Sequence, residues 1–131
     1  QVLKDGVRVS VQACLADIDG NLPPRTTQVY LTYDFAKDAL SVAGQVLGEH
    51  ARDCRFLLPI VCPHDAPRAL SGNALTLAGE AAALRVEASA FSAEPQPIFC
   101  LAGGFEALEL SIRPDEAGRF AFSIAAEERL G

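Results

Sequence analysis

The chain has 131 residues, half of them hydrophobic, and a formal net charge of −6. This composition is typical of a folded domain with an apolar core and excludes long disorder. The acidic balance argues against nucleic acid and anionic membrane surfaces as partners, because both bind basic patches. No apolar run approaches the roughly 18 residues that a membrane-spanning helix needs, so we expect no membrane insertion. We expect a single β-sandwich domain over residues 1–131.

Alternating apolar and polar residues predict two strands near the start of the chain. Val7, Val9 and Val11 alternate with polar residues, which is the pattern of a half-buried strand. Residues 27–35 place apolar side chains on one face and partly polar ones on the other, and they predict the next strand. The residues between 17 and 24, rich in Asp, Asn, Gly and Pro, are typical of a turn.

Residues 36–52 fit two structures. Apolar residues recur at helical spacing along one face, which indicates one short helix. Gly44 and Gly48 argue against it, because each costs about 1 kcal/mol in a helix interior. The alternative is a strand over residues 40–47, which we favour because sequential strands tend to pair.

The densest apolar segment covers residues 54–62. An extended strand here has apolar side chains on both faces, so we expect both faces to be covered or nearly so. Pro59 lacks a ladder donor, which favours an edge strand or a bulge. Pro63 and Pro67 then direct the chain into a loop.

The second half of the chain carries short apolar segments separated by Gly- and Pro-rich turns. Residues 74–78 and 84–90 predict one hairpin, residues 98–102 a further strand, and residues 107–112 and 119–124 a second hairpin. The fold class that follows is all-β: a two-layer antiparallel β-sandwich of about eight or nine short strands.

The disulfide candidates are Cys14, Cys54, Cys62 and Cys100. In an extended strand, Cys54 and Cys62 would lie roughly 26 Å apart at about 3.3 Å per residue, whereas a disulfide needs Cα atoms within about 7 Å. We therefore expect no bond between these two, and each can pair with Cys14 or Cys100 in an oxidising compartment. The alternative is four unpaired, buried thiols. Disulfides would indicate a secreted or periplasmic protein, and free thiols a cytoplasmic one.

The segment Cys62-Pro63-His64-Asp65 is the candidate for chemistry. Thiolates and imidazoles bind zinc, and a thiol beside an imidazole can act as a nucleophile. His50, Cys62 and His64 are therefore the alternative metal or thiol site, although their spacing matches no four-ligand zinc pattern. The other interpretation is a loop histidine beside a core cysteine. We expect no cofactor, and we consider His64 and Asp65 candidates for ligand contact in an exposed loop.

Asp17, Asp19 and Asn21 match part of a calcium loop. They would be positions one, three and five of an EF-hand, but Leu22 stands where that loop needs Gly and Gln28 where it needs Glu. An EF-hand is therefore excluded. A surface calcium ion held by turn carboxylates and an ordinary turn between strands remain as alternatives.

No motif for nucleophilic, phosphate, dinucleotide or zinc-protease chemistry occurs in the chain. We predict a non-catalytic binding or accessory β-sandwich module, with a protein or a carbohydrate as partner. Because the chain opens with Gln1, it fits a processed chain, or a fragment of or partner to a larger secreted bacterial protein. One alternative is the metal or thiol site above. The other is a structural C-terminal β-domain of a polysaccharide-active enzyme, which rests on analogy of fold.

Overall fold

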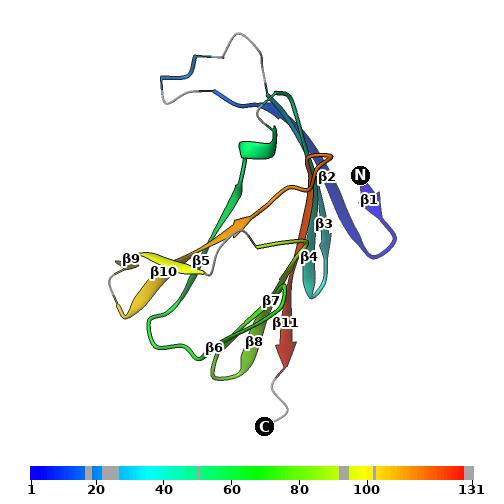
Figure 1. The fold of residues 1–131 in the computed structure, drawn as a ribbon. Helices are drawn as coiled ribbons and strands as arrows, with labels where there is room; N and C mark the ends of the chain where they lie inside the picture. Colours follow the sequence, from blue (N-terminus) through cyan, green and yellow to red (C-terminus); the bar gives the residue numbers. More distant parts are fainter. Residues whose placement is uncertain (17–18, 22–26, 50, 92–94, 102, 129–131) are drawn as a thin grey trace.

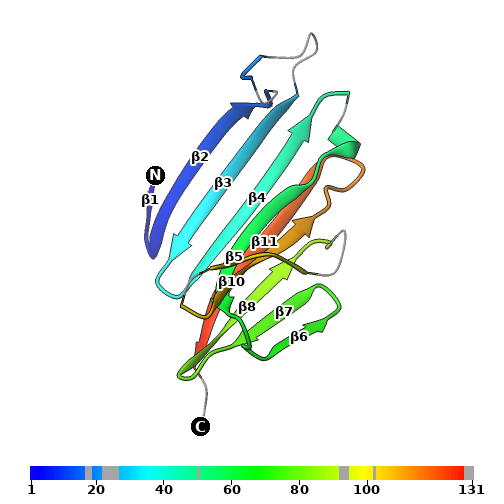
Figure 2. The ribbon, with the colours of Figure 1, turned by 90° about the vertical axis from the view of Figure 1, so that its left-hand side faces the viewer.

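The structure is a computed structural model that describes residues 1–16, 19–21, 27–49, 51–91, 95–101 and 103–128. Within these ranges the chain forms two antiparallel sheets, of eight and three strands, and its only helix is a single 3-10 turn. The smaller sheet lies to the left of the larger one in Figure 1, and Figure 2 shows it in front of part of the larger one. The predicted fold class, an all-β structure of two antiparallel layers, is confirmed. Within the same ranges, no helix is long and apolar enough to cross a membrane.

The larger sheet, sheet A, has the strand order β1-β2-β3-β4-β11-β8-β7-β6. Its strands are β1 (Val2–Leu3), β2 (Gly6–Cys14), β3 (Gln28–Ala36), β4 (Ala39–Leu47), β6 (Arg68–Ser71), β7 (Ala74–Ala78), β8 (Ala82–Ala88) and β11 (Arg119–Glu128). The smaller sheet, sheet B, has the order β5-β10-β9. Its strands are β5 (Phe56–Pro63), β9 (Gln96–Leu101) and β10 (Phe105–Ile112). The 3-10 turn η1 (Ala51–Asp53) connects β4 to β5.

The strand predicted for residues 40–47 is confirmed as β4, and the helical alternative for residues 36–52 is wrong. β4 pairs with β3 over residues 40–47 and with β11 on its other side, so its backbone groups are satisfied by the sheet. Gly48, with φ of 142°, ends the strand, and only η1 follows as a helical turn. The helical spacing of apolar residues in this segment therefore does not correspond to a helix.

The hairpin predicted for residues 107–124 is wrong, although both of its strands exist. β10 pairs with β5 and β9, whereas β11 pairs with β4 and β8, so the two strands lie in different sheets. The connection between them is fixed to sheet A, since the Val46 amide donates to the Gly118 carbonyl at 2.8 Å. Asp115 Oδ1 accepts from the Ala117 and Arg119 amides within the turn. A short Gly-containing loop can cross between sheets as readily as it can reverse within one.

The core lies between sheet B and the middle of sheet A. Leu108 and Leu110 of β10 are fully buried, and they pack against Leu75 and Val86 of sheet A. A second part of the core is aromatic. The Phe56 ring of β5 lies 5.2 Å from those of both Phe120 and Phe122 of β11, measured between centroids, which joins the two sheets.

Sheet B is too narrow to cover sheet A completely. Val7, Val9 and Val11 of β2 point toward the same side as the core but remain 40–44% exposed, so the predicted burial of this face is wrong for the described residues. On the outer side of β5, Leu57 and Val61 are 53% and 59% exposed, so the expectation that both faces of this strand are covered is also wrong. The edge-strand prediction from Pro59 is confirmed, because β5 lies at one edge of sheet B.

Replacing Gly44 with Ala should destabilise the fold. A Cβ atom at Gly44 would meet the Phe120 ring closer than van der Waals contact allows, so the aromatic contact between the sheets must shift. Overpacking of this kind costs about 1–3 kcal/mol of unfolding free energy, to be measured by urea denaturation. Ala43→Val, on the exposed side of the same strand, is the control and should change stability by less than about 0.5 kcal/mol. Equal stability of Gly44→Ala and the native chain would contradict this packing.

Candidate functional site

A cluster of charged side chains lies at one end of the sandwich, around Glu106. This residue begins the inward-facing row of β10 that continues with Leu108 and Leu110, and it pairs across the sheet with Cys62 of β5. Side chains alternate along a strand, so Glu106 points into the layer between the sheets. It is only 2% exposed, which makes it a buried carboxylate at the end of an apolar core.

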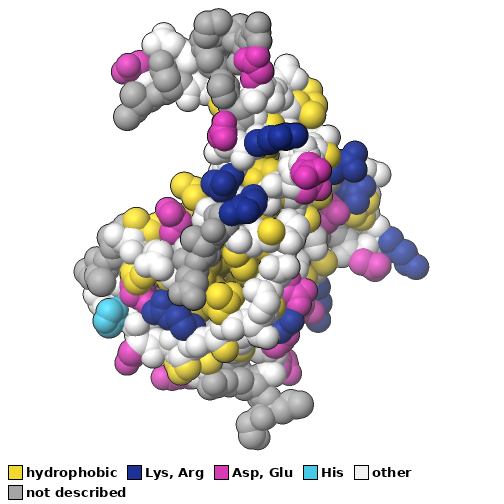
Figure 3. All heavy atoms as spheres, viewed as in Figure 1, with side chains coloured by type: hydrophobic (Ala, Val, Ile, Leu, Met, Phe, Trp, Pro, Cys, Tyr) yellow, Lys and Arg dark blue, Asp and Glu magenta, His cyan; other side chains and the backbone are white. Residues whose placement is uncertain are grey.

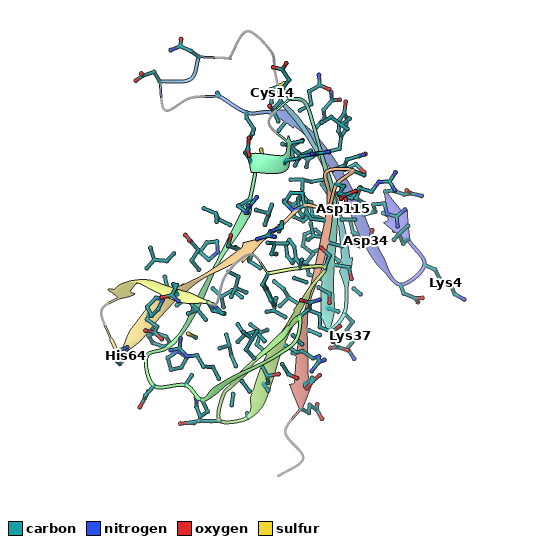
Figure 4. All side chains as sticks on the ribbon, viewed as in Figure 1. Lys4, Cys14, Asp34, Lys37, His64 and Asp115 are labelled. Carbon is teal, nitrogen blue, oxygen red and sulfur yellow. The ribbon has the colours of Figure 1, made fainter. Side chains whose placement is uncertain are left out.

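Two basic side chains, one from each side of the layer, reach this carboxylate. Arg68 of β6, in sheet A, donates from Nη2 to Glu106 Oε1. His64, in the turn after β5, places Nδ1 3.2 Å from Oε2. The His64 amide also donates to the Gly104 carbonyl at 2.8 Å, which fixes the turn against the β9–β10 hairpin. Figure 4 shows His64 at the end of β5, away from the middle of sheet A.

The cluster works mainly as a connection between the sheets. A buried carboxylate is costly unless it is paired and hydrogen-bonded, and both oxygens of Glu106 have a basic partner. Because Arg68 belongs to sheet A and Glu106 to sheet B, their ion pair fixes how the edge of one sheet sits over the other. A pair of this kind adds little net stability, because the cost of desolvating both charges offsets much of their attraction.

The histidine is the member of the cluster that faces solvent. Its side chain is 66% exposed, and an imidazole is visible at the surface in Figure 3. A carboxylate only accepts, so Nδ1 carries the proton toward Glu106, and Nε2 is the ring nitrogen left for another partner. Such a histidine can transfer a proton or act as one ligand of a metal ion. Among the residues that the structure describes, no three His, Cys, Asp or Glu side chains lie close enough to hold a metal ion.

The thiol of Cys62 is buried beside this cluster. Burial raises its pKa, the negative charge of Glu106 raises it further, and Arg68 acts in the opposite direction. A raised pKa keeps the thiol protonated near neutral pH and makes it a poor nucleophile. The predicted pair of a loop histidine and a core cysteine is therefore present, but His64 contacts Glu106 and not the Cys62 thiol.

The cysteines follow the predicted geometry in part. Cys14 and Cys62 carry free thiols, so Cys62 forms no disulfide with Cys54, as predicted, nor with Cys14 or Cys100. Cys14 is exposed on the polar side of β2, opposite the valines, because the β2–β3 register contains no bulge. The side chain of Cys100 lies outside those that the structure describes.

The other predicted ligand residues are not brought to this cluster. Asp19 and Asn21 are exposed in the loop after β2, and Figure 4 shows the end of β2, at Cys14, far from His64. Asp65 is exposed in the turn beside His64. Asp17 and His50 lie outside the described residues, so the predictions for them stay predictions.

Sequence reasoning missed the two residues that complete the cluster, Arg68 and Glu106. A signal for Glu106 existed, because it stands in phase with Leu108, Leu110 and Ile112 and so had to share their buried face. No comparable signal exists for Arg68. Its position depends on how sheet A folds over sheet B, which local patterns do not encode.

The outer face of sheet A carries two shallow hollows, of about 490 and 410 Å³. The first is lined by Tyr30, Gln45 and Arg119 together with small residues, and the second by Asp34, Glu87 and several serines and alanines. Beside them, Arg8 donates to Asp34 at 2.6 Å, which lowers the pKa of that carboxyl group. Both hollows are wide and open.

Together, these features define a two-sheet β-domain whose charged groups largely serve its own architecture. A family model described as the ulvan lyase C-terminal domain matches residues 1–127. The chain therefore belongs to the ulvan lyase C-terminal domain family. No curated protein and no solved structure matches it. Among the interpretations of the sequence, the family supports the β-domain of a polysaccharide-active enzyme better than a free-standing binding module.

Replacing Arg68 with Met should lower the free energy of unfolding by about 2 kcal/mol, because Glu106 would remain buried without its main partner. The double variant Arg68→Met/Glu106→Leu should regain most of this loss, since it removes the buried charge together with its partner. His64→Ala, at the exposed member of the cluster, should cost less than about 1 kcal/mol. Chemical denaturation measures all three, and a double variant no more stable than Arg68→Met would contradict the inter-sheet connection.

Proposed function

We propose that this chain is the non-catalytic structural domain of a polysaccharide lyase whose substrate is ulvan. The observation that carries the proposal is the family match over residues 1–127, which coincides with a two-sheet β-domain. Such a domain supports the fold or the substrate path of the enzyme that carries it. Because its substrate polymer would lie outside the cell, we further propose a secreted or periplasmic location.

The chemistry of the described side chains supports the non-catalytic part of the proposal. A catalytic acid or base needs a partner group and a site in which both face the substrate. Arg8 is paired with Asp34, and Glu106 is buried against Arg68. His64 is oriented by a carboxylate but lines none of the hollows described above, and the Cys62 thiol has a raised pKa.

The 131-residue chain alone should not cleave ulvan. In the longer lyase polypeptide that carries it, His64→Ala should leave the rate of cleavage within about twofold, because loss of a true acid or base costs about a hundredfold or more. The measurement is the initial rate of depolymerisation, with the unfolding temperature recorded for each variant. Cleavage by the chain alone would contradict the proposal. So would a hundredfold loss in a His64→Ala variant that unfolds at the native temperature.

A second candidate function, contact with the polysaccharide itself, is favoured by the outer face of sheet A. Tyr30 is 38% exposed beside the larger hollow, and its hydroxyl group donates to Gln28 Oε1 at 2.8 Å and accepts from Gln12 at 3.3 Å. A fixed aromatic ring next to Gln45 and Arg119 combines a stacking surface with polar groups, as saccharide sites do.

Tyr30→Ala should weaken binding of the 131-residue chain to ulvan about fivefold, since an aromatic stacking contact is worth about 1 kcal/mol. Affinity electrophoresis in gels with and without the polymer measures this change. Phe35→Ala removes an exposed aromatic ring from the other face of the same strand and is the matched control, with binding expected to stay native. Equal binding by Tyr30→Ala and the native chain would exclude this face as a polysaccharide site.

A further inference from the structure

The inner side of β2 and β3 forms an apolar surface that no part of the described structure covers. We call this surface the open face, and its main members are Val7, Val9 and Val11 of β2 and Tyr33 and Phe35 of β3. The three valines and Phe35 are 40–46% exposed. A contiguous exposed apolar patch often marks a surface at which another protein surface binds.

The open face continues the buried face of the core without interruption. Across the sheet, Val9 pairs with Tyr33 and Tyr33 with Val42, so the three side chains form one row on one side of sheet A. Exposure along this row falls from 42% at Val9 to 2% at Val42. The apolar sequence pattern therefore extends further than sheet B does. Figure 1 shows β2 and β3 standing beyond the strands of sheet B.

The opposite side of the same two strands carries polar and charged side chains. Arg8, Ser10 and Gln12 of β2 face Asp34, Thr32 and Tyr30 of β3, respectively, and Arg8 and Asp34 form an ion pair. A strand with one polar and one apolar face is typical of a sheet with solvent on one side only. The pattern thus indicates that the open face is covered in the complete protein.

A pocket marks the border between the open face and sheet B. It has a volume of about 260 Å³ and a largely apolar lining that includes Leu15, Leu31, Val46 and Phe56. Apolar pockets at the centre or margin of a docking surface hold the anchor side chains that contribute most of the binding energy. In Figure 3, apolar side chains gather in the space between the two sheets.

We propose that the open face is the surface on which the preceding part of the lyase polypeptide docks. The inference rests on the proposed function and on the family description, which names a C-terminal domain. The occupant is a folded apolar surface that lies across β2 and β3 and inserts side chains into the pocket. No charged side chain is a member of the open face, so it offers a saccharide few hydrogen bonds.

The position of the N-terminus favours this occupant over a second copy of the chain. β1 pairs with β2 at the outer edge of sheet A, so residue 1 lies at the margin of the open face. Figures 1 and 2 both show the N-terminus beside β2. A domain joined there is held at an effective concentration of the order of millimolar, which favours an intramolecular contact over self-association.

The docking partner should pack through side chains rather than extend sheet B. The edge strand β5 borders the pocket through Phe56. A strand added to sheet B at this edge would have to pair with β5, which contains Pro59. Pro59 has no amide proton to donate, which works against continuous strand pairing at this edge.

The test compares Val9→Asp with Ser10→Asp, its neighbour on the polar side of β2. In the longer lyase polypeptide, Val9→Asp should lower the unfolding temperature and raise hydrogen exchange along β2 and β3 at least fivefold, whereas Ser10→Asp should change neither. In the 131-residue chain Val9→Asp should cost clearly less stability than in the longer polypeptide, because Val9 is already 42% exposed there, and Ser10→Asp should again resemble the native chain. The native β2 and β3 amides should also exchange more slowly in the longer polypeptide than in the 131-residue chain.

Three outcomes would overturn the inference. Equal exchange of β2 and β3 in the two native proteins would show that nothing docks there. An equal loss of stability from Val9→Asp in both proteins would show that the valine serves the domain's own core. A native 131-residue chain that sediments as a dimer, and as a monomer with Val9→Asp, would assign the face to a second copy. A longer polypeptide that shows the expected protection but does not cleave ulvan would refute the proposed function and leave the docking surface intact.

Discussion

The structure depends on the insertion of β11 between two parts of sheet A that are distant in the sequence. The strands β1 to β4 come from residues 2–47 and the strands β6 to β8 from residues 68–88, and only β11 pairs with both sets. Its inner side chains Phe120 and Phe122 then meet Phe56 of sheet B. Gly44 is part of the same constraint, because any side chain there would occupy the space of the Phe120 ring. Since long-range pairing is slow to form, we expect the wide sheet to complete late in folding.

The same crossover explains the place of the charged cluster. Because β10 leaves its sequence neighbour β11 and lies in the middle of sheet B, its first inward residue, Glu106, is carried to the far end of the sandwich. There the two sheets are held by a charge pair instead of aromatic rings, with Arg68 supplied by the edge strand β6. An apolar pair in the same place could give similar stability. We interpret the cluster around Glu106 as a contact that positions the edge strand β6 of sheet A relative to sheet B.

The sequence was a good guide to strands and a poor guide to their partners. Alternation placed β2, β3, β7 and β8 correctly, and Pro59 correctly marked an edge. The local pattern gave wrong strand pairing where the pairing depends on distant parts of the chain, as in the predicted hairpin between β10 and β11. For the candidate site, His64 and Cys62 could be chosen as notable residues. Glu106 lies next to both of them. It could have been found only by noting that a charged residue stands in a row of buried apolar residues and must have a partner there.

On two faces of the domain, apolar side chains are more exposed than the sequence pattern predicts. Val7, Val9 and Val11 on the inner side of sheet A and Leu57 and Val61 on the outer side of sheet B are all more exposed than their patterns predict. Exposed apolar surfaces of this kind are where partners bind in other proteins. For the open face of sheet A, membership of a C-terminal domain family makes the preceding part of the same polypeptide the partner that we propose.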